Sequence, residues 1–423
     1  MVGGVESFGV AVGGIAGLLV VNVLPKDQYA AYTFLVACMT LMLGVTDLGL
    51  AHCCLPVVGQ RTKEVPWVVG ACQQVFRKRW LLLVLGLAVV VPYWFYSSRE
   101  HGWSGSGYLL ASALMVAVVL LSLREHYASQ VLLILGHIST LNRIGFSSHV
   151  VRICFVGAVL LLPMSSWSVA GVVAATAAAT LVSVTLYRRE FGVRRITDAR
   201  LSPEDARRVD AQVLQIAKPL VLPAIFYQVQ GVITVFLVSL FGTSNMVAEV
   251  GAFGRLSMVL IVVDRVTNIL LFPAIARAPA GARLGAILVQ VHLAYLLMMS
   301  AVLLTSFFLP QYWILLLGEK YRSMEPLVWM VFLSSILMNA SGFAFRTLTV
   351  RGATAGQSYS ILVTLATQVL YLWWIGISDL RSVLGFGIAT SVANFGYQYW
   401  LLGLRWREWQ REGASGGAQS PVP

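Results

Sequence analysis

Apolar residues run along the chain in long blocks separated by short polar segments. Twelve blocks come close to or exceed the roughly 20 residues that a helix needs to cross the hydrocarbon core of a bilayer. The predicted spans cover residues 7–25, 28–58, 80–98, 105–135, 144–163, 167–187, 213–241, 247–276, 284–310, 323–350, 356–378 and 382–404. The pattern therefore predicts an all-α integral membrane protein with about twelve transmembrane helices.

Composition supports this class. Hydrophobic residues make up 58% of the 423 positions, charged residues only 11%, and the mean hydropathy is +0.79. Soluble domains carry about a quarter charged residues. The five cysteines follow no CxxC spacing and the six histidines no HExxH pattern, so we expect no disulfide framework, no metal site and no cofactor.

The net charge of +12 is explained by topology rather than by nucleic-acid binding, because the arginines lie mostly in short segments between apolar runs. If the N-terminus is cytoplasmic, twenty-two lysines and arginines fall on the inside, five on the outside and three within spans. The positive-inside rule then places both termini in the cytoplasm. The first apolar run lacks a basic flank and a cleavage site, so we expect it to remain as a helix.

The longest inside segment, Tyr187–Gln212, divides the spans into two sets of six. The organisation that we predict is a six-helix N-terminal lobe (1–187), a cytoplasmic inter-lobe loop (188–212), a six-helix C-terminal lobe (213–404) and a disordered cytoplasmic tail (405–423). Equal halves permit a parallel internal repeat.

Two intramembrane acids fit such a repeat. Asp47 lies nine residues before Pro56, and Asp264 lies nine residues before Pro273. Proline removes a helical hydrogen bond and permits a kink at that point. A gate or coupling role for both acids, in which their ion pairs break as the lobes rock or a proton is carried, is one hypothesis. The alternative is a local device, in which Asp47 caps the backbone near Gly49 where the helix is interrupted.

Three stretches together resemble one transporter family: "PKDQYAAYTFLVACMTLMLGVTDLGLA" (Pro25–Ala51), "VAEVGAFGRLSMVLIVVDRVTNILLFPAIAR" (Val247–Arg277) and "LLLGEKYRSMEPLVWMV" (Leu315–Val331). With twelve spans in two halves, the chain resembles the polysaccharide transporter branch of the multidrug/oligosaccharidyl-lipid/polysaccharide (MOP) exporter superfamily, the Wzx-type flippases of O-antigen and exopolysaccharide synthesis.

The resemblance implies a MATE/MOP-like fold and an activity. The expected function is movement of undecaprenyl-diphosphate-linked oligosaccharide across the bacterial inner membrane by alternating access, without enzymatic catalysis. Expected partners are the lipid-linked oligosaccharide, membrane lipids and polysaccharide synthesis proteins, with no nucleic acid.

Candidate substrate-binding residues follow from the cost of charge inside a bilayer. Arg152, Arg255 and Arg265 lie within predicted spans, where a cation usually faces a water-filled cavity or a partner. A diphosphate would suit such a cavity, although pairing with Asp47, Asp264 or Glu249 would also satisfy them. Gln228 and Gln230 offer amides to sugar hydroxyls, or to neighbouring helices.

Two other functions stay open at this stage. An exporter of small amphiphilic molecules, as in the MATE branch, would favour a cavity of acids and aromatic residues. A membrane glycan polymerase or ligase would need a large outer loop, and the predicted outer loops are short.

Overall fold

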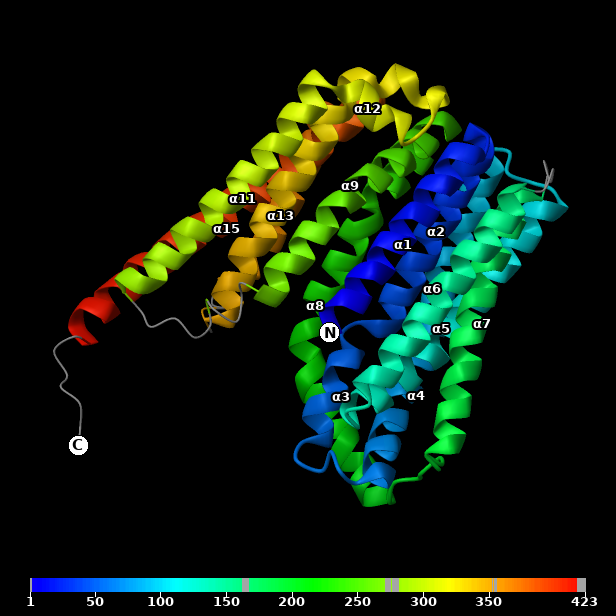
Figure 1. The fold of residues 1–423 in the computed structure, drawn as a ribbon, viewed down its shortest axis with the longest axis vertical. Helices are drawn as coiled ribbons and strands as arrows, with labels where there is room; N and C mark the ends of the chain where they lie inside the picture. Colours follow the sequence, from blue (N-terminus) through cyan, green and yellow to red (C-terminus); the bar gives the residue numbers. More distant parts are fainter. Residues whose placement is uncertain are drawn as a thin grey trace. The chain divides into compact units, whose positions relative to one another are not determined.

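The structure, a computed structural model, describes residues 2–161, 167–270, 275, 281–351, 353 and 356–416 (Figure 1). Every regular element within these ranges is a helix. By length and composition, eight of the described helices can cross a membrane, and two shorter apolar helices accompany them. The predicted fold class, an all-α integral membrane protein, is confirmed.

The chain forms two compact units that divide between Gly251 and Ala252. Unit 1 contains α1 (Val2–Val23), α2 (Lys26–Asp47), α3 (Leu50–Val58), α4 (Val65–Glu100), α5 (Ser106–Ile134), α6 (Ile138–Leu161), α7 (Ser168–Val193), α8 (Pro203–Phe241) and the start of α9 (Ser244–Leu270). Unit 2 contains the rest of α9, then α11 (Ala282–Phe308), α12 (Pro310–Leu315), the 3-10 helix η1 (Glu319–Leu327), α13 (Val328–Val350), α14 (Tyr359–Trp374) and α15 (Leu380–Gly416). The lobe limits expected from the sequence stay a prediction.

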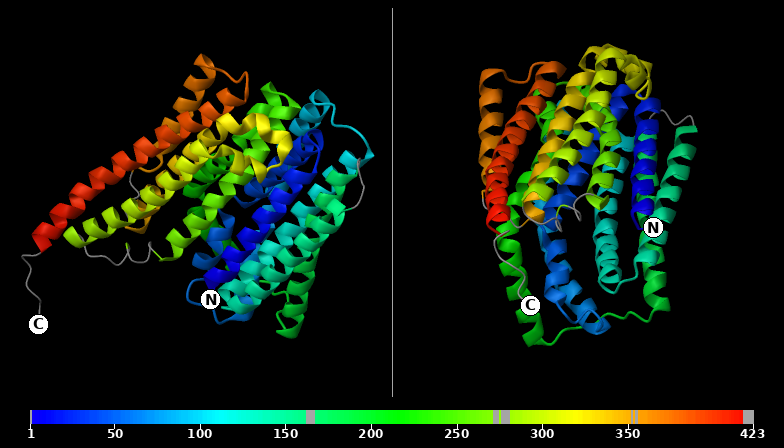
Figure 2. Two further views of the ribbon diagram at one scale, coloured as in Figure 1. Left: turned by 45° about the horizontal axis from the view of Figure 1, so that its top comes forward. Right: turned by 60° about the vertical axis from the view of Figure 1, so that its left-hand side comes forward.

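Helices within unit 1 pack lengthwise. α5 lies along α7, α6 lies between α1 and α7, and α2 packs against both α4 and α8 (Figures 1 and 2). Within unit 2, α13 packs along α15, and α14 lies against α15. Small apolar side chains permit this close packing in a membrane, where no hydrophobic force drives helices together.

In place of the disordered tail expected from residue 405, α15 continues to Gly416. Arg405 pairs with Glu408 one turn later at 2.6 Å, and Trp409 is buried beside Arg351. These contacts extend the helix past the apolar run. Residues 417–423 lie outside the described part of the chain.

The single span expected over residues 28–58 is wrong, because the helix breaks after Asp47. Leu48 and Gly49 both have positive φ, 39° and 83°, so neither continues a right-handed helix. The Leu48 N–H still donates to the Gly44 carbonyl, and α3 begins at Leu50. Glycine adopts this conformation without steric cost, whereas Leu48 is held there by its surroundings.

The break lies about one hydrocarbon thickness from the far ends of α2 and α4. Asp47 is 21 residues from the start of α2 at Lys26, and Arg79 is 21 residues from the end of α4 at Glu100. Both counts correspond to about 30 Å, the thickness of the hydrocarbon core. With the orientation predicted above, we expect Asp47 and Arg79 to lie at the cytoplasmic face and α3 to lie beyond it.

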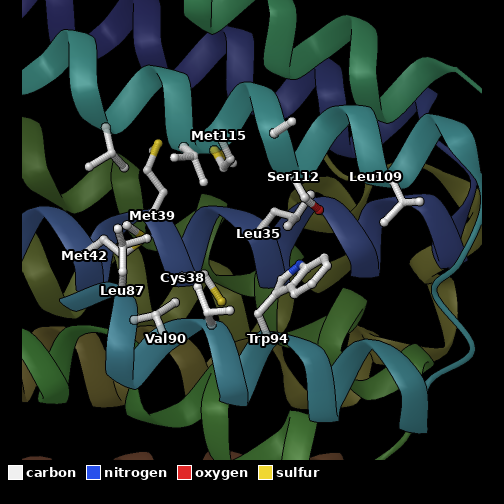
Figure 3. Close-up of a pocket in the computed structure, with 14 residues that line it drawn as sticks. Leu35, Cys38, Met39, Met42, Leu87, Val90, Trp94, Leu109, Ser112 and Met115 are labelled. Atoms are coloured by element: carbon white, nitrogen blue, oxygen red, sulfur yellow. The ribbon is translucent and has the colours of Figure 1, made fainter. Parts of the chain in front are cut away.

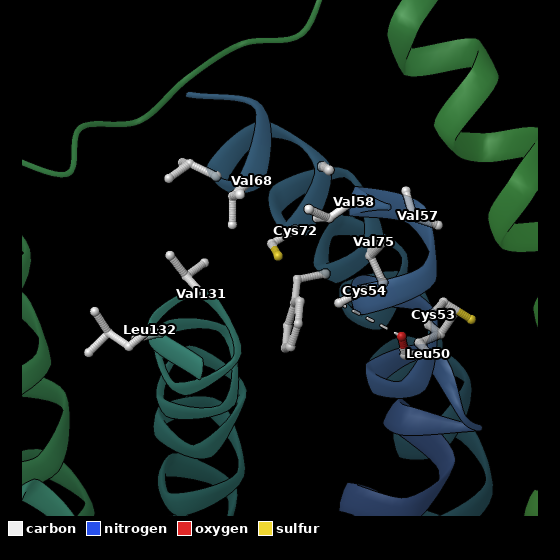
Figure 4. Close-up of a cluster of buried hydrophobic side chains, with 14 of the residues drawn as sticks. Leu50, Cys53, Cys54, Val57, Val58, Val68, Cys72, Val75, Val131 and Leu132 are labelled. Atoms are coloured by element: carbon white, nitrogen blue, oxygen red, sulfur yellow. Dashed lines mark hydrogen bonds between the residues drawn. The ribbon is translucent and has the colours of Figure 1, made fainter. Parts of the chain in front are cut away.

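Beyond this break unit 1 has its own apolar core, which we call the inner cap. It joins α3, the first turns of α4, the end of α5 and the first turns of α8 (Figure 4). Cys54, Cys72, Val75 and Leu132 are almost fully buried in it. Ion pairing adds to it, since Lys78 binds Asp210 at 2.7 Å. The inner cap explains why α4 and α8 begin well before the spans expected at residues 80 and 213.

Candidate functional site

A charged cluster occupies the break between α2 and α3. The Asp47 carboxylate lies 3.4 Å from the Arg79 guanidinium, and its Oδ1 also accepts a hydrogen bond from the Ala51 N–H at 3.2 Å. The second contact satisfies a backbone donor at the start of α3, as N-terminal caps do. Asp47 therefore makes the capping contact that the local alternative describes. Its role as a gate stays a prediction.

Arg79 is the buried member of this cluster. Its side chain is 1% exposed, against 27% for Asp47. The Nε atom donates to the Thr46 carbonyl at 3.2 Å, and the guanidinium lies 3.4 Å from His126 Nδ1 on α5. Burying a guanidinium is costly unless it is paired and hydrogen-bonded, and these contacts from α2 and α5 supply part of the compensation, while the buried Nη1 atom has no hydrogen-bond partner among the described residues.

Sequence reasoning placed Arg79 among the loop cations and so missed it. The residue closes the tripeptide Arg77–Arg79 directly before the apolar run of α4, which reads as a cytoplasmic flank. Counting 20 residues back from the outer end of α4 would have indicated its depth. That Arg79 is buried and faces Asp47 depends on the packing of α4 against α2, which no local pattern contains.

Arg152 lies well inside the apolar helix α6, away from both of its ends. It is nine residues before the end of α6 at Leu161, about 14 Å along the helix, and its side chain is partly buried. Its Nε atom is buried and has no hydrogen-bond partner among the described residues. His149 lies one turn earlier on the same helix. No described acid pairs with Arg152, so the position carries a net positive charge.

Gln228 contacts α2 closely instead of standing apart. A Cβ atom added at Gly44 would overlap Cδ and Oε1 of Gln228. Gly44 thus permits α8 to approach α2 at this point. Gln230 is partly buried and makes interactions of its own. These contacts fit the interhelical alternative, and contact of either amide with a sugar stays a prediction.

The remaining sequence candidates lie on α9. Arg255 is partly buried in unit 2, where its Nη1 atom lies 3.8 Å from Met258 Sδ, and it makes further interactions. The side chains of Asp264 and Arg265 lie outside the described part of the structure. The predicted set as one site therefore stays a prediction, and the proposed twin of Asp47 has no described side chain.

A second polar network closes the opposite end of unit 1. Lys26 at the start of α2 pairs with Glu249 of α9 at 3.3 Å. His101 Nε2 lies 2.9 Å from the Ser239 carbonyl of α8, and the Tyr93 hydroxyl bonds the Ser239 hydroxyl. These contacts tie α2 and α4 to α8 and α9. The pairing also neutralises Glu249, the other described acid that the sequence offered as a partner for intramembrane arginines.

Solved structures share this arrangement of helices over nearly the whole chain. A multidrug resistance MATE family transporter of the MOP superfamily in its inward-facing conformation is 16% identical, with a TM-score of 0.71 over 95% of this chain and 96% of that chain. This chain has a MATE transporter fold. An outward-facing MATE transporter is 15% identical with a TM-score of 0.59 over 97% and 95% of the two chains.

A third MATE structure, in complex with MaD5, is 14% identical with a TM-score of 0.62 over 97% and 94% of the two chains. No protein-family model matches the chain, and no curated protein sequence matches it significantly. At these identities the likeness establishes the MATE fold and leaves the substrate to be argued from the residues.

Proposed function

We propose that this chain is a flippase that moves undecaprenyl-diphosphate-linked oligosaccharide across the inner membrane by alternating access. The observation that carries the proposal is the charge at Arg152, a cation well inside the apolar helix α6 whose buried Nε has no partner among the described residues. A cation within a membrane span is retained when it meets an anion or a wet cavity. A diphosphate supplies two anionic groups that match guanidinium donors.

The pairing of two acids in unit 1 supports an anionic substrate. An exporter of cationic amphiphiles needs an acid that is available to its substrate. In unit 1, Asp47 is paired with Arg79 and Glu249 is paired with Lys26. These two carboxylates are therefore already compensated inside the protein. The MATE fold is compatible with either substrate class, and the charge balance favours the lipid diphosphate.

The proposal includes an orientation and excludes catalysis. We place both termini in the cytoplasm, so that the break at Asp47 faces the side on which lipid-linked oligosaccharide is made. No covalent step is required, because alternating access changes only which side of the membrane the bound lipid faces. A glycan polymerase or ligase is the less favoured reading, and polysaccharide synthesis proteins are the proposed partners.

A flipping assay tests the proposal with the full-length protein in proteoliposomes. The probe is a fluorescent undecaprenyl-diphosphate-linked oligosaccharide, and a membrane-impermeant reductant quenches the outer leaflet. We expect the wild-type protein to make the whole probe pool accessible, Arg152→Gln to slow this at least about tenfold, and Arg152→Lys to retain part of the rate. The matched control is Arg143→Gln, an exposed arginine of the same helix, which should flip at the wild-type rate.

Two results would contradict the proposal. One is a wild-type protein that leaves the probe in its original leaflet while it accumulates a cationic dye, which would favour the MATE-like drug exporter. The other is an equal loss of rate in the Arg152→Gln and Arg143→Gln variants, which would mean that the position of Arg152 has no special role.

A further inference from the structure

Two cavities lie along the same pair of helices in unit 1. The lower cavity, about 320 Å³, is lined by Gln73, Phe76, Arg77 and Trp80 of α4 and by Leu123, Arg124 and Tyr127 of α5. The upper cavity, about 250 Å³, lies between α2, α4 and α5 and is almost wholly apolar (Figure 3). Neither cavity includes a residue of the Asp47 cluster or Arg152.

The two cavities lie on one continuous helical face. Along α4 the lining residues recur every three or four positions, from Gln73 and Arg77 through Trp80 to Leu87 and Trp94. This spacing keeps side chains on one side of a helix. The surface between the cavities is apolar and open, since Val84 is 66% exposed there.

α5 presents the matching face. Its lining residues recur at the same interval from Leu109 through Val116 and Val119 to Leu123 and Tyr127. Leu109 and Val116 are exposed, so the upper cavity opens toward lipid rather than into the protein interior. Figure 3 shows Leu109, Ser112 and Met115 of α5 facing Leu87, Val90 and Trp94 of α4 across the groove.

The lower cavity has the chemistry of an anion site. Arg77 and Arg124 both line it, both are exposed, and neither has an acidic partner among the described residues. The nearby acids are engaged elsewhere: Asp198 accepts from the Gln73 amide at 2.6 Å, and Asp210 pairs with Lys78 at 2.7 Å. Two like charges on one cavity repel each other unless an anion lies between them.

Depth places this anion site at the level of lipid headgroups. Arg77 is 23 residues from the outer end of α4 and Arg124 is 18 residues from the start of α5, both close to the 20 residues that cross the core. Trp80 and Tyr127 beside them are the residue types of the membrane interface. From Arg77 to Leu87 is about 15 Å along α4, half of the hydrocarbon thickness and therefore within reach of one acyl chain.

We infer that the α4–α5 groove binds an anionic phospholipid of the inner leaflet. Its phosphate lies between Arg77 and Arg124, and one acyl chain follows the open face past Val84 into the apolar cavity lined by Met39 and Met115. The flexible thioethers of methionine adapt to a chain of irregular shape. This site is separate from the proposed transport path and does not depend on the proposed substrate.

Native mass spectrometry of the delipidated full-length protein tests the headgroup. We expect phosphatidylglycerol to bind at least about tenfold more tightly than phosphatidylcholine with the same chains. Arg77→Gln/Arg124→Gln should remove this preference, a tenfold change equivalent to about 1.4 kcal/mol, and Arg77→Lys/Arg124→Lys should retain most of it. The matched control is Arg188→Gln/Arg189→Gln, two exposed arginines at the end of α7, which should keep the wild-type preference.

Crosslinking tests the path of the chain. Phosphatidylglycerol with a diazirine midway along one acyl chain should label peptides covering residues 87–94 of α4 and 109–119 of α5, and the arginine double variant should lose this label. Labelling elsewhere, an unchanged preference in Arg77→Gln/Arg124→Gln, or an equal loss in the α7 control would overturn the inference. Displacement of the lipid by millimolar inorganic phosphate would also overturn it, because the site would then serve a soluble anion.

Discussion

Asp47 and Arg79 approach to 3.4 Å across 33 positions of sequence, and the pair fixes the point at which α2 ends and α3 begins. The carboxylate pairs with the guanidinium and accepts a hydrogen bond from the Ala51 N–H. The guanidinium in turn donates a hydrogen bond to the carbonyl of Thr46, the residue before Asp47. The charge that interrupts an apolar stretch is thus part of the junction between α2 and α3.

Removing Asp47 should cost more than removing Arg79, because Asp47→Ala leaves the buried guanidinium of Arg79 without its counter-charge. Loss of one partner from a buried ion pair destabilises by about 3–5 kcal/mol, and the 27% exposure of Asp47 lets water relieve the partner that remains when Arg79 is replaced. We expect Arg79→Ala to lower the free energy of unfolding by about 3 kcal/mol, because a cavity and an unbonded Thr46 carbonyl remain. Thermal unfolding in detergent measures this, with exposed Arg188→Ala as the control.

A double-mutant cycle separates the pair from its surroundings. If the two side chains interact, Asp47→Ala/Arg79→Ala should be less destabilised than the sum of the two single variants. Strict additivity would show that the 3.4 Å approach contributes no coupling.

Gly44→Ala should destabilise unit 1 through overpacking. The new methyl group would meet the end of the flexible Gln228 side chain, which has to turn away to admit it, so we expect a loss of about 1 kcal/mol, the low end of the cost of overpacking. Gln228→Ala in the same chain should restore most of the loss by removing the obstructing side chain. Gly145→Ala, where no atom lies within 4 Å of the added Cβ, is the control; it gains only the helix propensity of alanine and should unfold at or slightly above the wild-type temperature. No rescue by Gln228→Ala would contradict the close approach of α8 to α2.

The start of α15 should lose stability in acid. Asp379 Oδ1 accepts from the Ser382 N–H at 2.8 Å, and this hydrogen bond lowers the pKa of the Asp379 carboxyl. A lowered pKa means that the stabilisation is present above the ordinary value near 3.9 and disappears as the pH falls through the lower folded value. We expect Asp379→Ala to cost less than about 1 kcal/mol at pH 7 and less again below about pH 3.

Thermal unfolding at the two pH values measures this difference. Glu319→Ala removes an exposed acid whose partner Arg322 lies 3.7 Å away, and it should change little at either pH. A constant effect of Asp379→Ala between pH 7 and pH 3 would contradict the role of its charge.

Membrane topology is testable with single cysteines in a cysteine-free chain. The excess of arginine on one side predicts that Arg189→Cys reacts with impermeant maleimide only from the cytoplasm. Lys320→Cys and Ser378→Cys should react only from outside. The reverse pattern would invert the orientation on which the placement of Asp47 and of the lipid groove depends.

Helices were the most predictable feature, since each apolar run of sufficient length has to satisfy its backbone internally in a bilayer. The exceptions are two segments whose local sequence pattern does not show where the helix ends or begins. The run through Asp47 reads as one span because apolar residues continue on both sides of the break, and only the positive φ of Leu48 and Gly49 ends the helix. The polar first turns of α8 read as a loop, because the inner cap that buries Val209 and Val213 is assembled from distant segments.

By itself the sequence determined that the chain spans a membrane as an all-helical protein. A backbone in hydrocarbon has to form its hydrogen bonds internally, and long apolar runs do so as helices. It also determined which charged and polar side chains are costly to place inside a bilayer. Tertiary structure decided which of these side chains have a partner. Asp47 pairs with Arg79, Glu249 pairs with Lys26, and Gln228 packs on Gly44. No described acid pairs with Arg152, whose Nε atom has no hydrogen-bond partner among the described residues. Such compensation depends on side chains from different helices, and their distances are set by packing rather than by spacing along the chain.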